Sequence, residues 1–556
     1  MTSPSSVTPT PSTSAKTTLD CRVDATAAIE VDVADKASMC HIWALGVLTV
    51  IGGQFYGWNE ALSTGFVPYF VSQVLMGLAF IAYMACASEV CGKIQFSGGA
   101  YGLARVTLGF YTGFLVGFLE LLEYVTYTSV SVLFMSDFMT TTYGVEKAWE
   151  PLLWAIYYAV TTSLILLRGK HFWRFCLVLA AACVVPPLVY CVASIGHTDF
   201  ATYGPLQIGN ASEQEVWVTG DLGAAYFAWL PYTTWAYAGV ECLTLVTSVT
   251  KDAKTSMPKG LMAATYTLFV FNVALVCIVS ALPPGLAATA SAQFPLNTGF
   301  ELGLHMSAHG ASWLIMPGQF GMAFGFMMPC ARLAQALADS NLLPLRLGIK
   351  GQSTPRRALV LTSTSGYLIC LVSFYSPLFL SALQNISILA AVLCYGAQIG
   401  GFVMLRTRYR TETTGYVSPF GMPGAVYACV IYSLLGISII GGFQDDNGVA
   451  LGSLIAFLMV LSLYYHFVCK KIQSISKDEY SSIFRFSVMK FNAARKKKTT
   501  NGGTKHGASK NTHLSANGPK PNGCSNGHGG SGRTFGLGGA TRGSSIKSIA
   551  VQAAKA

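Results

Sequence analysis

Charged side chains are scarce in this chain. Asp, Glu, Lys and Arg make up 11% of its 556 residues, whereas hydrophobic residues make up 52%. About a quarter of the residues of a typical soluble domain are charged. The composition therefore excludes an ordinary water-soluble domain and is typical of an integral membrane protein, so we expect a lipid membrane to surround it.

The excess positive charge is confined to one segment. From residue 470 to the C-terminus there are 16 Lys and Arg against two acids, so the formal net charge of +11 leaves −3 for the rest of the chain. Basic residues just past the last apolar run are common in cytoplasmic tails and can contact anionic lipid. Nucleic-acid binding is therefore not indicated, although the protein is basic overall.

Several sequence signals are absent. Residues 1–40 contain no early apolar segment, so no cleavable signal peptide is predicted. The 15 cysteines form no CxxC pair and lie mostly inside apolar runs, so neither a metal site nor a disulfide framework is indicated. No HExxH, GxSxG or GxxxxGK[ST] occurs, so no enzyme and no cofactor is predicted.

Apolar runs fill the middle of the chain, and twelve of them are long enough to cross a bilayer, which takes about 20 residues. We therefore predict an all-α integral membrane protein with one twelve-helix domain over residues 41–470. The flanking tails, 1–40 and 471–556, are predicted to be disordered. The runs span residues 41–62, 67–91, 111–138, 149–167, 173–196, 223–248, 260–283, 311–336, 357–376, 379–405, 424–443 and 448–469.

Lys and Arg are distributed unevenly among the connections. Basic residues follow every even-numbered run, such as Arg168, Lys170 and Arg174 after the fourth, whereas the odd-numbered exits contain only Lys147. Because positive charge stays on the cytoplasmic side, both termini are predicted to be cytoplasmic. Asn210 begins an Asn-Ala-Ser sequon in a predicted outer loop and is a candidate glycosylation site. These features favour the plasma membrane, although an internal membrane would give the same pattern.

The first apolar run is interrupted near its middle by Gly52 and Gly53, and the polar residues Gln54 and Asn59 follow. Two glycines allow the backbone to leave helical geometry. Unwound backbone at membrane depth occurs only where it is buried in protein or lines a cavity, and broken helices form the binding sites of many secondary transporters. The alternative interpretation is close packing of two helices through small residues.

The sixth run is interrupted as well, because it contains Pro231, Gly239 and the ionisable Glu241. Proline removes a backbone donor and kinks a helix, and we expect the helix to unwind over residues 236–239. The two interrupted runs are five spans apart and so would cross the membrane in opposite directions. This relation is typical of a five-plus-five inverted repeat.

Such a repeat divides the predicted domain into two halves. The first would cover about residues 41–196 and the second about residues 223–405. Two extra helices, at residues 424–469, would lie outside the repeat.

Three of the acids within the apolar runs lie well inside their runs. Glu120 and Glu123 are three residues apart and so share one face of a helix, and Glu241 follows the second interruption. Acids in a membrane are costly, and each is a candidate for function. Glu241 is a candidate for gating or proton transfer, or else a satisfied structural acid. The other two could meet the ammonium group of a substrate or a helix-packing donor.

Aromatic residues gather at the same places: Tyr56 by the first interruption, Trp235 and Tyr237 by the second, and Tyr124 beside the acids. Such rings are commonly core or interface anchors. Their position at both interruptions also suits gates, or a cation–π wall for an amine.

Several motifs together resemble those of one family. The first run, GVLTVIGGQFYGWN, resembles the start of the ethanolamine-permease-like branch of the amino acid–polyamine–organocation transporter superfamily. SGGAYGLARVTLG is similar to its GGxYxxxRxxxG signature, WAYAGVE resembles its F-x-G-x-E stretch, and ARLAQALADSNLLP resembles the end of its eighth helix. The resemblance covers about residues 41–470.

The resemblance implies a leucine-transporter-like fold and alternating access around a midplane site between the first and sixth helices. Trp235 would be the gate, and Glu241 would be the acid coupled to protons. By position, backbone at the two interruptions would line the site: Ile51, Gly52, Gly53, Tyr237, Ala238 and Gly239.

The chain departs from the family pattern in three places. Gln95 stands where a proline is usual, and the fifth run lacks the mid-helix lysine of some proton-coupled members. The middle of the eighth run, PGQFGMAFGFMMPC, offers no Ser or Thr for the usual second sodium site. We therefore expect protons rather than sodium to drive transport through Glu241, while uncoupled transport or exchange stays open.

These features predict a secondary active transporter for a small amino acid or an amine such as ethanolamine. A carboxylate would need the N–H groups of the first interruption, whereas an amine would need acids and aromatic faces. A transporter-like nutrient receptor without net flux is the alternative. The predicted substrate-binding residues are Ile51, Gly52, Gly53, Tyr56, Glu123, Tyr124, Trp235, Tyr237, Ala238 and Gly239, and those for proton coupling and gating are Glu241 and Trp235.

Overall fold

The computed structural model describes residues 36–55, 57–93, 98–167, 169–208, 214–343, 355–409, 415–444, 446, 448–475 and 480. Over these residues the chain is mostly helical, with one small two-stranded sheet. The predicted binding residue Tyr56, the sequon residue Asn210, Gln95 and most of both tails lie outside the described residues.

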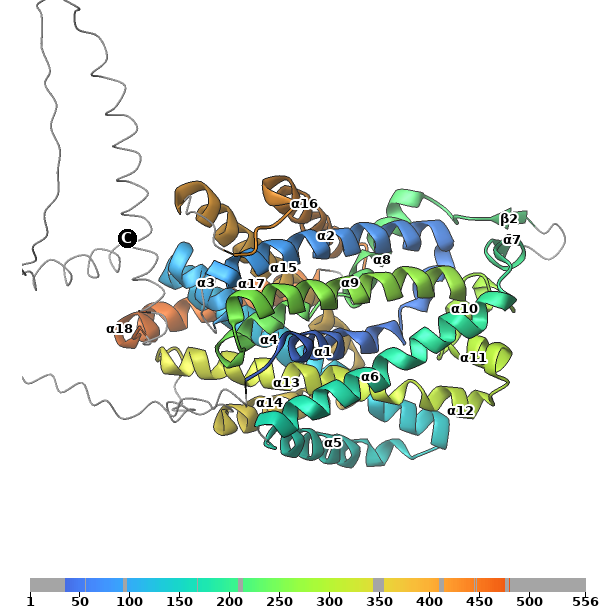
Figure 1. Cartoon of the computed structure of the whole chain (residues 1–556), viewed down its shortest axis with the longest axis horizontal. Helices are drawn as coiled ribbons and strands as arrows, with labels where there is room; N and C mark the ends of the chain where they lie inside the picture. Colours follow the sequence, from blue (N-terminus) through green and yellow to red (C-terminus); the bar gives the residue numbers. More distant parts are fainter. Residues whose placement is uncertain are drawn as a thin grey trace, which may run out of the picture.

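The long helices lie side by side along the length of the molecule (Figure 1). Among the described residues, nine helices are long and apolar enough to cross a membrane, which indicates a multi-pass membrane protein. They are α2 (Phe66–Lys93), α4 (Phe110–Tyr143), α6 (Gly169–Ser194), α9 (Ala253–Val279), α13 (Met316–Asp339), α14 (Arg356–Tyr375), α15 (Pro377–Tyr409), α16 (Gly421–Ile440) and α17 (Val449–Tyr464) with its continuation to Ile472.

Three predicted spans contain shorter helices. These are α1 (Met39–Val50), α5 (Glu150–Ile165) and α8 (Leu222–Thr234). The arrangement of twelve spans in a five-plus-five repeat therefore stays a prediction. α1 lies in the middle of the molecule, packed against α6, α9 and α13 (Figure 1), as expected for a helix that is apolar on all sides.

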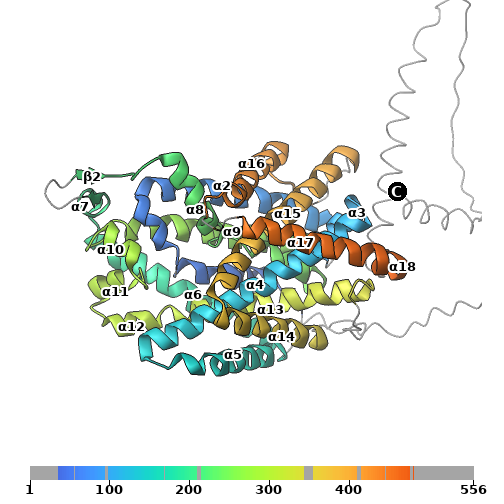
Figure 2. The same ribbon diagram turned by 180° about the vertical axis from the view of Figure 1, so that it is seen from behind.

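Short elements gather at the two ends of the bundle. One end carries α3 (Gly99–Thr107) and α18 (Lys470–Ile472), and the other carries α7 (Phe200–Tyr203), β2 (Gln214–Val216), α10 (Leu286–Ser291) and α11 (Asn297–Leu304), as Figures 1 and 2 both show. β2 pairs antiparallel with β1 (Leu206–Ile208), and α12 (Ala308–Trp313) precedes α13. We call these the α3 end and the α10 end.

A buried carboxylate ties the α3 end together. Glu89, near the C-terminus of α2, accepts hydrogen bonds from Arg406 Nη2 at 2.6 Å, from Lys93 Nζ at 2.6 Å and from the backbone N–H of Ser418 at 2.8 Å. The charge of Glu89 is therefore compensated on two sides, as a buried acid requires. The cluster joins α2, α15 and the segment before α16.

The two termini of the described domain also pack at the α3 end. The Ala37 N–H donates to Val249 O at 2.8 Å, so chain ahead of α1 is bound to the end of the sixth predicted span. Beyond the predicted boundary at 470, Arg105 Nη2 donates to Ser474 O at 2.9 Å, and the Ser474 N–H donates to Ser340 O at 3.0 Å. The packed domain thus extends to about Ser474.

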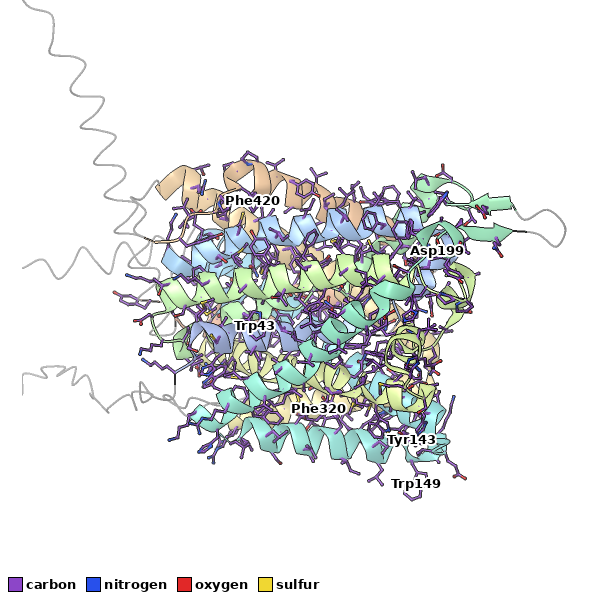
Figure 3. All side chains as sticks on the ribbon, turned by 45° about the vertical axis from the view of Figure 1, so that its right-hand side comes forward. Trp43, Tyr143, Trp149, Asp199, Phe320 and Phe420 are labelled. Carbon is purple, nitrogen blue, oxygen red and sulfur yellow. The ribbon has the colours of Figure 1, made fainter. Side chains whose placement is uncertain are left out.

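Polar contacts also order the α10 end. Asn59 is 2% exposed, and its side-chain amide lies 2.8 Å from Thr289 O and 2.7 Å from Ala292 O. Asp199, labelled in Figure 3, caps α7. The hydroxyl of Thr202, which donates to Asp199 at 2.7 Å, is the main cause of the lowered pKa of that acid.

Candidate functional site

The first interruption lies where the sequence predicts it. The α-helix ends at Val50, Ile51–Gln54 form a single 3₁₀ turn (η2), and a second 3₁₀ segment (η3) follows at Asn59–Thr64. Backbone freed from a helix needs new partners in a membrane. Gln319 Nε2 on α13 supplies one, because it donates to Gly52 O at 3.0 Å.

Gly53 brings the two interruptions into contact. A Cβ atom at this position would lie 2.6 Å from the carbonyl oxygen of Trp235, closer than real Cβ contacts occur. Only glycine permits such an approach between two backbones. The η2 turn therefore lies directly against the start of the second interruption.

The second interruption begins later than its proline. α8 continues through Pro231 to Thr234, and residues 235–239 form the turn that leads into η6 (Val240–Val249). Gly239 has a φ of +113°, which strongly favours glycine, and a Cβ atom there would collide with the ring of Phe326. The predicted unwinding over residues 236–239 is therefore confirmed, and Pro231 lies inside the helix that precedes it.

Two features distinguish the backbone at and after this second turn. Asn272 Nδ2 on α9 donates to Ala236 O at 3.0 Å, which satisfies a carbonyl that the helix has lost. η6 is a 3₁₀ helix of 10 residues, although such helices seldom exceed three or four residues and mark hinges or strained sequence when they do. The chain after the turn is thus wound more tightly than an α-helix.

Glu241 folds back onto its own turn. It is 1% exposed, and its two carboxyl oxygens lie 3.0 and 2.9 Å from the backbone N–H of Gly239, which donates to them. Since that N–H belongs to the unwound backbone, the acid is coupled directly to the second interruption.

Tyr395 on α15 links Glu241 to Glu123 on α4. Its hydroxyl oxygen lies 3.4 Å from Glu241 Oε1 and 3.3 Å from Glu123 Oε1. A phenol carries one proton and can donate only one hydrogen bond. Both contacts are hydrogen bonds only when one of the two carboxyl groups carries a proton of its own. The three side chains are therefore arranged to hold a shared proton.

Glu120 has a different role from Glu123, although both lie on one face of α4. Its carboxyl accepts from the backbone N–H of Ala100 at 3.3 Å, from that of Tyr101 at 3.1 Å and from the hydroxyl of Tyr124 at 3.2 Å. The first two donors are N–H groups of the first turn of α3, which a carboxylate stabilises. Glu120 therefore anchors α3, and it engages the hydroxyl of the predicted binding residue Tyr124.

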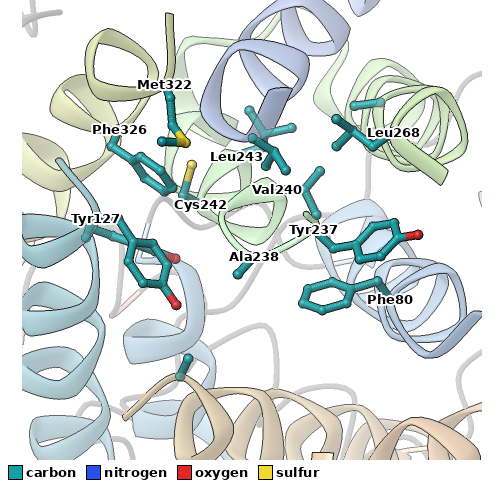
Figure 4. Packing of buried hydrophobic residues seen from close by; sticks show 14 of the residues in the cluster. Phe80, Tyr127, Tyr237, Ala238, Val240, Cys242, Leu243, Leu268, Met322 and Phe326 are labelled. Carbon is teal, nitrogen blue, oxygen red and sulfur yellow. The ribbon is translucent and has the colours of Figure 1, made fainter. Parts of the chain in front are cut away.

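The aromatic residues divide into two groups around Ala238. Tyr127 and Phe326 lie on one side of it, and Tyr237 and Phe80 lie on the other (Figure 4). Tyr127 packs edge-on against Trp235, with ring centroids 4.9 Å apart. The side chain of Tyr237 stacks on Phe80 of α2, with ring centroids 5.5 Å apart.

The structure brings together most of the predicted residues. Glu123, Glu241 and Trp235 lie at the second interruption, which touches the first at Gly53. Sequence reasoning missed five contributors: Tyr127, Tyr395, Phe326, Asn272 and Gln319. For Asn272 and Gln319 a signal was available, because both are polar residues inside apolar runs.

A cavity of about 30 Å³ lies on the α3 side of the acids, between α2, α3, η6 and α15. Its walls include Tyr83, Thr244 and Gln398. A water molecule needs roughly 10–15 Å³ of such space and several polar neighbours, so the cavity can hold water. In the described ranges, no three His, Cys, Asp or Glu side chains are grouped to bind a metal ion.

Comparison with known proteins gives consistent results. The sequence model of the amino acid permease family matches residues 40–473. An uncharacterized transporter of Rhizobium meliloti is 24% identical over 458 residues, which cover 77% of this chain and 90% of the relative. The amino-acid permease RocC of Bacillus subtilis is 21% identical over 453 residues, which cover 78% and 94%. The methylthioribose transporter of the same organism is 25% identical over 258 residues, which cover 43% and 53%.

Proposed function

The chain belongs to the amino acid permease family, and on that premise we propose that it carries a small amino acid or an amine such as ethanolamine across a membrane by alternating access. The observation that carries this proposal is the contact between the two helix interruptions at Gly53 and Trp235, beside two buried acids. Interrupted helices that meet in a bundle are a common substrate site of secondary transporters. The three relatives are named as transporters or permeases, which agrees with a non-enzymatic role.

The relatives differ in their substrates, since one is named for amino acids and another for methylthioribose. We propose twelve spans in a five-plus-five repeat, both termini in the cytoplasm and a plasma-membrane location. The positions of the helices and the basic connections support this topology.

Protons are proposed to drive transport through Glu241. A carboxylate accepts a hydrogen bond from an N–H group more strongly than a protonated carboxyl does. Protonation of Glu241 therefore loosens its hold on the Gly239 N–H, which is then free to meet a substrate or to let the turn move. Tyr395 supports this step, since its hydroxyl contacts both Glu241 and Glu123. The shared proton can therefore reside on Glu123 when it leaves Glu241.

The water-sized cavity supports a route for that proton. It lies between the acids and the α3 end, and the proposed topology has this end in the cytoplasm. A proton that enters with the substrate from outside would leave Glu241 through this space. This order of events gives uptake that increases when the outside is acidic.

The variant Glu241→Gln tests the coupling. Uptake is measured in proteoliposomes with a neutral interior and either an acidic or a neutral exterior. The wild type is expected to take up substrate faster with acid outside, and Glu241→Gln is expected to lose this dependence while it retains binding. Glu301→Gln, at an acid on α11 outside the site, is the matched control and keeps the wild-type pH dependence.

Two results would change the proposal. An unaltered pH dependence in Glu241→Gln removes this residue from proton coupling. Binding of substrate to the wild type without any flux favours a nutrient receptor, and flux that requires substrate on both sides favours an exchanger.

A further inference from the structure

Residues near the end of the packed domain tie α13 to α3. The Ser474 N–H donates to Ser340 O, just past the end of α13, at 3.0 Å. The Ser474 carbonyl oxygen accepts from Arg105 Nη2 on α3 at 2.9 Å, and its hydroxyl oxygen accepts from Asn341 Nδ2 at 2.8 Å. We call residues 470–475, which include these contacts, the strap.

The strap completes a ring of contacts on the α3 side of the site. α3 packs against η6, where a Cβ atom on Gly99 would lie 2.9 Å from the side chain of Leu245. η6 in turn contacts α13, because Arg332 Nη1 donates to Ser248 Oγ at 3.3 Å. α3, η6, α13 and the strap therefore form a closed ring. α3 and η6 cannot move away from α13 together unless the strap detaches from α3 or from α13.

α13 has a weak point between the site and the strap. Pro329 lies inside this helix and lacks the N–H group that would bond to the preceding turn, so the helix can bend there. Before the proline, Phe326 lies against Gly239 of the second interruption. Beyond it, Arg332 contacts η6. The part of α13 after Pro329 can therefore separate from η6 while the earlier part stays at the site, and the strap restrains this end.

The strap can detach without unfolding of the core. Its contacts with α3 and α13 are hydrogen bonds between partly exposed groups, and the side chains of Lys470, Lys471 and Ile475 are exposed. Segments of this kind are the first to open locally. The strap also follows a π-helix at Tyr465–Cys469, a rare element that often occurs at functional positions. Its partner Asn341 has a left-handed backbone with a φ of +55°, which is uncommon for a residue other than glycine.

We propose that the strap is an autoinhibitory contact. While it is attached, it holds the α3 side of the site closed, and its release lets the end of α13 separate from η6. In the proposed topology the α3 end faces the cytoplasm, so release of the strap opens the site toward that side. The opening can be measured without a substrate, and only its effect on uptake rests on the proposed function.

Native cysteines report the opening in the purified full-length protein. Cys330 directly follows Pro329 on α13 and is 2% exposed, so a water-soluble maleimide is expected to reach its thiol faster when the α3 side opens. Cys183 on α6 is 0% exposed and donates to Pro317 O near the other end of α13 at 3.1 Å, so it reports a general loosening of the bundle. Mass spectrometry after timed labelling gives the rate at each cysteine separately.

Two variants weaken the strap without a change in the site. Ser474→Ala removes the hydroxyl group that contacts Asn341 Nδ2 and Asp339 O. Asn341→Gly removes the amide from the other side, and glycine accepts the left-handed backbone. Ser433→Ala is the matched control, because this exposed hydroxyl on α16 donates to Cys429 O of its own helix. Thermal unfolding checks that each variant is folded.

Both strap variants should label Cys330 about fivefold faster than the wild type, since the loss of one hydrogen bond shifts an opening equilibrium by about this factor. Cys183 should label at the wild-type rate in both variants, and Ser433→Ala should label like the wild type at both cysteines. In proteoliposomes, the strap variants should also take up labelled ethanolamine or alanine, whichever the wild type accumulates, faster than the wild type.

Three results would overturn the strap as an autoinhibitory contact. The first is labelling of Cys330 within about twofold of the wild type in both variants. The second is equal acceleration at Cys183 and Cys330, which would mean that the whole bundle has loosened. The third is faster labelling of Cys330 with unchanged uptake.

Failure of folding and failure of transport are also informative. If one variant fails to fold, labelling of the other decides, and if neither folds, the strap is part of the core and cannot act as a releasable contact. Faster labelling of Cys330 alone, in a protein whose wild type takes up neither probe, contradicts the transport function and leaves the strap intact. Uptake by the wild type, with unchanged labelling in both variants, does the reverse.

Discussion

The variant Gly53→Ala tests whether the contact between the two helix interruptions is essential. A methyl group at this position would lie 2.6 Å from the carbonyl oxygen of Trp235, about 0.8 Å inside the 3.4 Å at which ordinary contact begins. The atom that it meets belongs to backbone, so no side-chain rotation can relieve the overlap. Either η2 or the turn that starts at Trp235 must move.

The energetic cost follows from the size of the overlap. Insertion of one methyl group into a packed interior usually costs about 1–3 kcal/mol, because the backbone shifts and side chains leave their preferred rotamers. In this position the strain separates the two segments that are proposed to hold the substrate. A loss of 1–3 kcal/mol in substrate binding is about 5- to 150-fold in affinity.

Uptake and thermal unfolding measure the two consequences. Gly53→Ala is expected to reduce uptake at low substrate concentration by about tenfold and to lower the unfolding temperature. Gly396→Ala is the matched control, because no heavy atom lies within 4 Å of the Cβ position on this α15 residue. Alanine favours helix over glycine by about 0.8–1.0 kcal/mol, so Gly396→Ala should transport normally and unfold at the same or a higher temperature.

One result would refute this reasoning. If Gly53→Ala transports and unfolds like the wild type while it retains the fold, the contact with Trp235 is not needed, and the two interruptions do not act as one site.

Two other predictions concern the ends of the bundle. Asn59→Ala leaves the buried carbonyls near α10 without their donor. It should reduce the free energy of unfolding by about 1–3 kcal/mol, measured by thermal unfolding, and an unchanged midpoint would show that water replaces the amide. At the α3 end, Arg406→Ala removes two hydrogen bonds from buried Glu89 and should destabilise the protein more than Lys93→Ala, which removes one. Adding Glu89→Gln should partly restore the stability of Arg406→Ala, since the buried charge is then absent; failure to do so contradicts the ion-pair explanation.

Sequence patterns predicted the helical bundle and both interruptions well. Glycines and polar residues within an apolar run break the helix locally. The end of α1 at Val50 and the turn at residues 235–239 could therefore be predicted from the neighbouring sequence. Pro231 agrees with the predicted place of the unwinding at residues 236–239, because a helix can continue through a proline when its neighbours accommodate the kink. Only the packed structure shows that α8 extends to Thr234.

The roles of the acids depended on contacts between distant parts of the chain. Glu120 and Glu123 look equivalent in the sequence, yet only Glu120 anchors α3. Its two N–H donors there, on Ala100 and Tyr101, precede it by 20 and 19 residues. Tyr395 reaches Glu123 from 272 residues away. No local pattern marks such a tyrosine within an apolar helix, so its link between two acids could not be predicted.

Uptake by the wild-type protein in proteoliposomes is the most direct test of the proposed function. The panel is labelled ethanolamine, a neutral, a basic and an acidic amino acid, and a polyamine, each with a neutral interior and an acidic or a neutral exterior. We expect accumulation of at least one small amine or amino acid, faster with acid outside. Binding of a panel member without accumulation of any of them, at either external pH, would contradict the assignment as a secondary transporter.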